Sequence, residues 1–227
     1  FLRVQVGDGT DQVDVAGIED LDVDLAAGAD DITINDLSST EVSLIQVDLG
    51  AADGAADAAH LAGADGQRYS LSASLDAVTG EVHVDGLASD VQLDSAEAGD
   101  TLELTGGDRD DSLTASGDLS GVITVELRGA GGDDVLTGGD DLEGGAGADL
   151  MEQAFVGATV EGGDGEDTIV AGSGNITVDG GADSDTIVVR GTSSSDVIDV
   201  AQTAAGTLRH AVGGVIDGAG VTTETDT

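Results

Sequence analysis

The chain of 227 residues contains no cysteine, proline, tryptophan or lysine, and it has only three aromatic residues. Without cysteine, disulfide bonds and thiol chemistry are excluded. The six Lys+Arg positions are all arginine and face 47 acidic residues, which gives a formal net charge of -41. A basic face that could follow phosphates is therefore missing, and nucleic acid is excluded as a partner. No apolar run approaches the roughly 20 residues that span a bilayer, so direct membrane insertion is excluded as well.

Aspartate and glycine are what the chain has in abundance. Of the 47 acidic residues 36 are Asp, and 37 residues are Gly. High acidity with few aromatics is typical of disordered chains, but 39% of the residues are hydrophobic and can form a core. Such a core would form against strong self-repulsion, so the carboxylates require neutralising cations. The short side chain of Asp beside Gly favours turns that coordinate a hard cation, and Ca²⁺ is the best candidate.

A glycine-rich pattern recurs with a fixed period in the second half of the chain. Gly-Gly-x-Gly-x-Asp ends at Asp149 and again at Asp167, and a third copy ends at Asp185 with Asp183 in place of its third glycine. These aspartates are 18 residues apart. Weaker copies end at three further positions, Asp111, Asp134 and Asp196.

Between the glycine-rich turns lie short segments in which apolar and polar residues alternate, as in strands with one buried face. We predict an all-β fold, a right-handed parallel β-solenoid (β-roll or β-helix) with Gly/Asp-rich calcium-binding turns. Residues 1–104 form irregular circuits, 105–200 form regular circuits, and 201–227 start a further, incomplete circuit. Asp20, Asp22 and Asp24 mark the wet face of a strand, whereas residues 55–62, although rich in Ala, are expected to form an extended loop.

The turns of residues 105–200 resemble the repeats-in-toxin (RTX), haemolysin-type calcium-binding β-roll family. The resemblance implies a parallel β-roll with several Ca²⁺ ions between adjacent turns, held by motif carboxylates and turn carbonyls. An alternative is that Gly and Asp make tight corners without metal. The implied metal ligands are Asp111, Gly132, Asp134, Gly145, Gly147, Asp149, Gly163, Gly165, Asp167, Gly181, Asp183, Asp185 and Asp196.

The family resemblance and the composition favour a structural role over catalysis. We expect a calcium-binding segment of a secreted or cell-surface protein, such as a surface layer, an adhesin stalk or an extracellular filament, rigidified by Ca²⁺. The alternative is a calcium-binding domain appended to a secreted enzyme, such as a protease or a polysaccharide-modifying enzyme. Catalysis within this segment is not expected, because lysine is absent, arginine is scattered and aromatic platforms for sugars are missing. The expected partners are calcium and either copies of the chain, end to end, or the rest of a longer chain; adaptation to salt without a specific metal is a third hypothesis.

Overall fold

The computed structural model describes residues 2–6, 11–50, 54–152, 154–171, 176–189 and 208–210, with side chains described from residue 16 to residue 189 of these ranges. Every regular element in this part of the chain is a β-strand, from β1 to β20. The prediction of an all-β fold is therefore confirmed. In the same ranges there is no helix long and apolar enough to cross a membrane.

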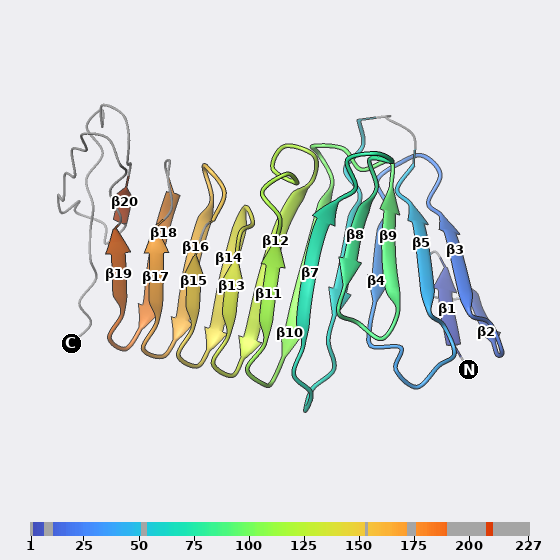
Figure 1. Ribbon diagram of the computed structural model, residues 1–227. Helices are drawn as coiled ribbons and strands as arrows, with labels where there is room; N and C mark the ends of the chain where they lie inside the picture. Colours follow the sequence, from blue (N-terminus) through green and yellow to red (C-terminus); the bar gives the residue numbers. More distant parts are fainter. Residues whose placement is uncertain are drawn as a thin grey trace.

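The strands form two long sheets and one hairpin (Figure 1). The hairpin pairs β1 (Leu2–Val6) with β2 (Asp11–Val15). In spatial order, the eight-stranded sheet contains β4 (Asp31–Ile34), β6 (Ala58–Ala62), β10 (Thr101–Gly107), β12 (Thr124–Gly131), β14 (Asp141–Ala146), β16 (Thr159–Asp164), β18 (Ile176–Ala182) and β20 (Leu208–His210). The ten-stranded sheet contains β3 (Asp20–Asp24), β5 (Leu44–Asp48), β9 (Asp90–Asp94), β8 (Val82–Asp85), β7 (Ser70–Leu75), β11 (Ser112–Ala115), β13 (Val135–Thr137), β15 (Leu150–Glu152), β17 (Thr168–Ala171) and β19 (Thr186–Val189).

From β10 to β19 the chain alternates strictly between the two sheets. From β10 to β17 each strand pairs in parallel with the strand two positions further on, as β10 does with β12 and β11 with β13. The strands consequently follow one another along the molecule, with β3 and β19 toward opposite ends (Figure 1). Long sheets of parallel strands are thus the main feature of the fold.

The core consists of apolar columns that this register creates. In the eight-stranded sheet one buried column runs through Leu104, Leu127, Leu142, Val160 and Val178. A facing column in the ten-stranded sheet runs through Leu71, Leu113, Leu136, Met151 and Ile169. Because side chains alternate between the two faces of a sheet, every second residue of a strand points into the core and the residues between them point outward. Each buried Leu, Ile or Val contributes about 1.5–3 kcal/mol.

The expectation of parallel pairing is corrected at three places. β1 pairs antiparallel with β2, β18 pairs antiparallel with β20, and β8 runs antiparallel to both β7 and β9. The β7–β8 turn has a clear local cause, since Asp76 Oδ1 accepts the N–H groups of Val78 and Thr79 and Gly80 takes a φ of 85°. This hairpin adds strands to the ten-stranded sheet, while in the eight-stranded sheet β6 still pairs directly with β10.

Two local expectations have different outcomes. The expected loop at residues 55–62 is wrong, because Ala58–Ala62 forms β6 between β4 and β10. Ala59 and Leu61 alternate into the core there, so burial between two strands overrides the weak strand propensity of alanine. The wet-face prediction for β3 is confirmed, since its three aspartates are exposed while Leu21 and Val23 are partly buried.

The corners that lead from the eight-stranded to the ten-stranded sheet are nearly constant, and the return corners are not. After β12, β14, β16 and β18, three residues separate each strand from the next one; after β10, four do. The return corners take up the variation, with eight residues between β11 and β12 but three between β13 and β14. Return corners of unequal length thus leave the residues of the constant corners stacked.

Replacing Gly147 by Ala tests how tightly the constant corners stack. Gly147 has φ +137°, and a Cβ there would lie within 3.0 Å of the carbonyl oxygen of Gly132 in the preceding circuit. Gly157, on a return corner, has φ +96° but no atom within 4 Å of such a Cβ. Thermal unfolding at a fixed calcium concentration should show the melting temperature of Gly157→Ala falling by about 2–4 °C, the effect of 1 kcal/mol in a domain of this size. The fall for Gly147→Ala should be at least twice as large, and equal falls in the two variants would contradict the stacking.

Candidate metal centre

Five aspartates lie in one column along the constant corners. They are Asp111, Asp134, Asp149, Asp167 and Asp185, and we call them the aspartate column. The residue after each of these aspartates is the first residue of a strand in the ten-stranded sheet. Those following residues are in mutual register, since Ser112 pairs with Val135, Val135 with Leu150, Leu150 with Thr168 and Thr168 with Thr186. Sheet register therefore stacks the carboxylates.

A hydrogen-bond ladder joins the members of the aspartate column. The backbone N–H of Asp111 donates to Oδ1 of Asp134 over 2.6 Å, and the N–H of Asp134 donates to Oδ1 of Asp149 over 2.8 Å. Asp149 and Asp167 continue the ladder toward Asp185 at 2.8 and 3.0 Å. The steps cover 23, 15, 18 and 18 residues. One oxygen of each accepting carboxylate is thus satisfied by the protein.

The second carboxylate oxygen has no such partner. Oδ2 is buried and has no hydrogen bond of normal geometry in Asp111, Asp134, Asp149 and Asp167, residues that are at most 3% exposed. Only at Asp111 does a further backbone N–H, that of Gly107, lie near enough to lower the pKa of the carboxyl group. Leaving a buried acceptor unsatisfied costs about 1–3 kcal/mol, and more when the group is charged. Stacked strands lie about 4.8 Å apart, so these carboxylates also repel one another. The column therefore contains four buried carboxylate oxygens without a donor among the described residues.

The first glycine of each corner brings a backbone carbonyl close to the unpartnered oxygen. A Cβ on Gly129 would lie within 3.0 Å of both Asp134 Oδ2 and the carbonyl oxygen of Gly144. The same holds at Gly144, where the two oxygens belong to Asp149 and to Gly162. Only glycine leaves space for both oxygens. Two acceptors thus converge at each corner.

Burial shifts the acid–base equilibrium of the column. It raises the pKa of Asp134 to about 7 and that of Asp149 to about 6, and neighbouring aspartates add to both shifts. The pKa values of Asp111 and Asp167 are also raised, again mainly by burial. The N–H donors of the ladder oppose these shifts without cancelling them. Burial thus makes ionisation of these four carboxyl groups less favourable than it is in solvent.

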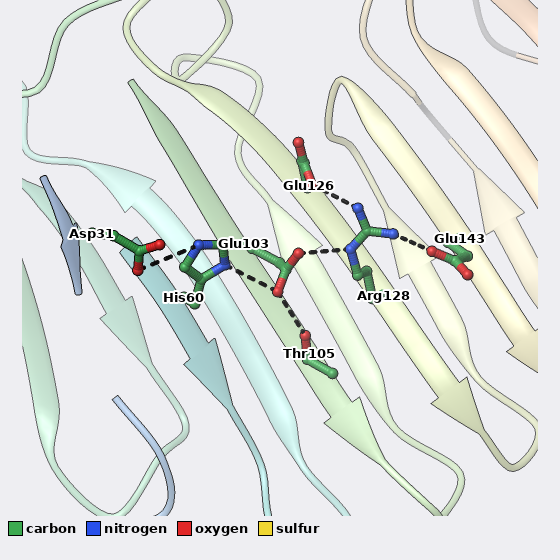
Figure 2. A network of polar contacts seen from close by, with 7 residues as sticks. All are labelled: Asp31, His60, Glu103, Thr105, Glu126, Arg128 and Glu143. Atoms are coloured by element: carbon green, nitrogen blue, oxygen red, sulfur yellow. Dashed lines mark hydrogen bonds and ion pairs between the residues drawn. The ribbon is translucent and has the colours of Figure 1, made fainter. Parts of the chain in front are cut away.

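On the outer face of the eight-stranded sheet, acidic residues are neutralised by the protein itself (Figure 2). Arg128 donates to Glu103 at 2.7 Å, to Glu126 at 2.8 Å and to Glu143, and Glu103 also contacts His60 at 3.2 Å. These contacts hold the pKa of Glu103 below its usual value despite partial burial. Within the described ranges no Arg or His forms an ion pair with the aspartate column.

A second row of buried aspartates lies at the return corners and shows what a purely structural aspartate looks like. Asp57 N–H donates to Oδ1 of Asp100 over 3.0 Å, and the N–H of Glu97 donates to the other oxygen over 2.7 Å. Asp100 is 1% exposed, yet both of its oxygens are satisfied. Position in a stacked corner alone does not leave an oxygen without a donor. Among the side chains that the structure describes, buried oxygens without a donor occur only in the aspartate column.

The remaining predicted ligands line the same corners. Gly132, Gly145, Gly147, Gly163, Gly165 and Gly181 all have positive φ, and so does Asp183 at 73°. The carbonyl oxygens of Gly145 and Gly147 face the equivalent glycines of the next circuit. Asp183 is exposed, Asp185 is partly buried, and Asp196 lies outside the described residues. The structure thus brings the predicted ligands to one edge, with the column aspartates inside.

Sequence reasoning missed part of this edge. The first glycine of each corner was not among the predicted ligands, although it is the first residue of the repeated Gly-Gly pair. Tyr69, whose backbone N–H donates to Oδ1 of Asp111 at the same edge, was not predicted either, because it belongs to no copy of the repeat. In the described ranges no three His, Cys, Asp or Glu side chains gather closely enough to form a metal cluster by themselves. Any ion held here would thus need backbone carbonyls in addition to carboxylates.

Comparison with protein-family models, curated proteins and solved structures finds no match to this chain. Fold and site define the class: an all-β protein of long parallel sheets whose constant corners carry a buried aspartate column.

The pH dependence of stability tests the column without metal. Because the pKa of Asp134 is raised from 3.8 to about 7 by folding, its contribution is fully present below pH 3.8 and is lost as the pH rises through 7. In EGTA, the melting temperature should therefore rise as the pH falls from 8 to 5.5. In Asp134→Asn the side chain is neutral at every pH, so we expect a smaller rise and, at pH 8, a melting temperature about 2–4 °C above that of the native chain.

The matched control is Asp133→Asn, which removes an exposed carboxylate on the same corner. It removes one negative charge, as Asp134→Asn does, but because this carboxylate is exposed the variant should keep most of the native pH dependence. If the two variants behave alike, the effect comes from net charge rather than from the buried column.

Proposed function

We propose that this chain is a calcium-binding structural segment in which Ca²⁺ binds along the aspartate column and rigidifies the stacked sheets. The observation that carries the proposal is the set of buried Oδ2 atoms without donors in four successive circuits. A divalent cation would neutralise two carboxylates at once and remove the repulsion between neighbours. It would also supply the partner that each unsatisfied oxygen lacks.

The chemistry of the donor set favours Ca²⁺. Carboxylates and backbone carbonyls are hard oxygen ligands, and Ca²⁺ accepts six to eight of them in a flexible arrangement. Mg²⁺ needs a small octahedron and retains its waters, and transition metals prefer imidazole or thiolate ligands. The column aspartates, with the carbonyl groups of corner glycines such as Gly145, Gly147, Gly163 and Gly165, would hold the ion. This is the ligand set that the resemblance to the RTX family implies.

We further propose that the two sheets are the walls of a right-handed parallel β-solenoid of the β-roll type. Three features support this: strict alternation of successive strands between the sheets, in-register parallel pairing, and constant corners on one edge. In the described part of the chain β3 pairs only with β5 and β19 only with β17, so each is an edge strand. Such edges suit stacking on further circuits of a longer chain or on another copy.

An extracellular structural role follows from these proposals. A chain with a net charge of -41 expands where calcium is scarce and compacts where calcium neutralises its carboxylates. Extracellular calcium-binding modules bind Ca²⁺ weakly, with dissociation constants of about 10⁻⁴–10⁻³ M, and are therefore filled only where calcium is abundant. We therefore propose a non-catalytic segment of a secreted or cell-surface protein, such as a surface layer, adhesin stalk or filament.

A circular-dichroism titration tests calcium-coupled folding. Because calcium binds the folded column and not the expanded chain, the strand signal and the melting temperature should rise as Ca²⁺ is added to protein in EGTA. At 100 times the dissociation constant, one site adds about 2.7 kcal/mol, which corresponds to roughly 5–10 °C. KCl at moderate concentration should give a smaller rise. An unchanged signal with Ca²⁺, or full replacement of Ca²⁺ by KCl, would contradict the proposal.

Asp149→Asn separates column binding from general charge neutralisation. The amide keeps the shape of the side chain and can accept the N–H of Asp134, but it carries no charge for Ca²⁺. We expect the variant to lose much of the calcium-induced stabilisation while its melting temperature in EGTA stays equal to or above the native value. Asp133→Asn, on the exposed side of the column, should keep the native calcium response. Equal losses in both variants would place the effect outside the column.

A further inference from the structure

We propose that Tyr69 closes the aspartate column at its N-terminal end, so that Asp111 is the first carboxylate of the column able to bind a cation. This inference rests on the proposed calcium binding. It sets the N-terminal end of the metal site, because no residue before Asp111 contributes a carboxylate to the column. The argument depends on Tyr69 occupying an aspartate position in the ladder.

Backbone geometry places Tyr69 one step before Asp111. Ser112 N–H donates to the carbonyl oxygen of Tyr69 over 2.9 Å, just as Val135 N–H donates to that of Asp111 over 2.9 Å. Tyr69 N–H donates to Oδ1 of Asp111 over 2.6 Å, the same bond that Asp111 makes to Asp134. Tyr69 is thus a member of the ladder in everything except its side chain.

The ring of Tyr69 fills the space that carboxylate oxygens fill elsewhere. A Cβ on Gly63 would lie within 3.0 Å of two ring carbons of Tyr69 and of the carbonyl oxygen of Gly106. A Cβ on Gly106 would lie within 3.0 Å of Asp111 Oδ2 and of the carbonyl oxygen of Gly129. The two corners match, except that aromatic carbon replaces an ionised oxygen. No buried oxygen without a donor results at the Gly63 corner.

The polar end of Tyr69 is satisfied by the protein. Its hydroxyl oxygen accepts the N–H of Ala64 over 3.0 Å, and its ring packs against the hydrophobic core. On the exposed side of the same edge, its neighbour Arg68 forms an ion pair with Asp110. The other carboxylate oxygen of Asp110 accepts the N–H of Asp133. Arg68 and Tyr69 together end the stack with a positive charge outside and an apolar ring inside.

Calcium stoichiometry of the full chain tests this limit. Tightly bound Ca²⁺ is counted by equilibrium dialysis for the native chain, Tyr69→Asp, Tyr69→Phe and Asp134→Asn. We expect Tyr69→Asp to bind one Ca²⁺ more than the native chain and Tyr69→Phe to bind the native number, because phenylalanine keeps the ring. A native number in Tyr69→Asp would overturn the inference. No change in Asp134→Asn would instead overturn the proposed function, since the column would then not bind calcium at all.

A second measurement does not depend on the folding of Tyr69→Asp. Tyr69 is the only tyrosine and the chain has no tryptophan, so Tb³⁺ luminescence excited through tyrosine reports an ion close to this ring. Along the column Asp111 is one circuit from Tyr69, whereas Asp185 is five circuits away, on the order of 25 Å at about 4.8 Å per strand. We expect native protein to sensitise Tb³⁺, Asp111→Asn to fall to the level of Tyr69→Phe, and both Asp185→Asn and Asp110→Asn to retain the signal. Full emission from Asp111→Asn would overturn the inference.

Discussion

The hydrogen bond from the backbone N–H of one corner aspartate to Oδ1 of the next is the interaction on which the constant edge depends. It repeats from Asp111 to Asp185 at 2.6–3.0 Å and follows the register of the ten-stranded sheet. The ladder fixes each carboxylate in an orientation that buries its second oxygen. The bond that stacks the column therefore also determines which carboxylate oxygen is left without a donor.

The acidic side chains of this protein have three different kinds of surroundings, which distinguishes the column from the rest. On the outer face Arg128 gathers three glutamates, and at the return corners Asp100 receives two backbone donors. In the aspartate column a backbone N–H donates to one oxygen of each carboxylate, and among the described residues no Arg or His forms an ion pair with it. An acidic surface adapted to salt would not need this difference, because exposed acids are screened by any counterion. Burial of unpartnered oxygens requires a partner at a defined place.

The two edges of the sheets differ in how much the lengths of their corners vary. Insertions enter the return corners, where eight residues can replace three without changing the sheet register. The column edge tolerates no such change, because glycine positions such as Gly129 and Gly144 lie against oxygens of the neighbouring circuit. Tyr69 keeps the backbone of that edge while ending its charge. A single side chain can therefore end the column without changing the backbone of the edge.

The sequence by itself determined the all-β class, the alternating strands and the corner aspartates, because period-two hydrophobicity and repeated glycine are local signals. It did not reveal β6 or the place of Tyr69 in the ladder, since both depend on residues distant in the chain. It also missed the β7–β8 hairpin, although the turn of that hairpin is formed locally at Asp76. Ala59 is buried only because β4 and β10 flank it. Equally, Asp100 and Asp134 are both buried stacked aspartates, and only the tertiary structure shows that one has two donors and the other has one. Which carboxylates lack a partner is decided by the neighbouring circuits, and composition cannot encode that.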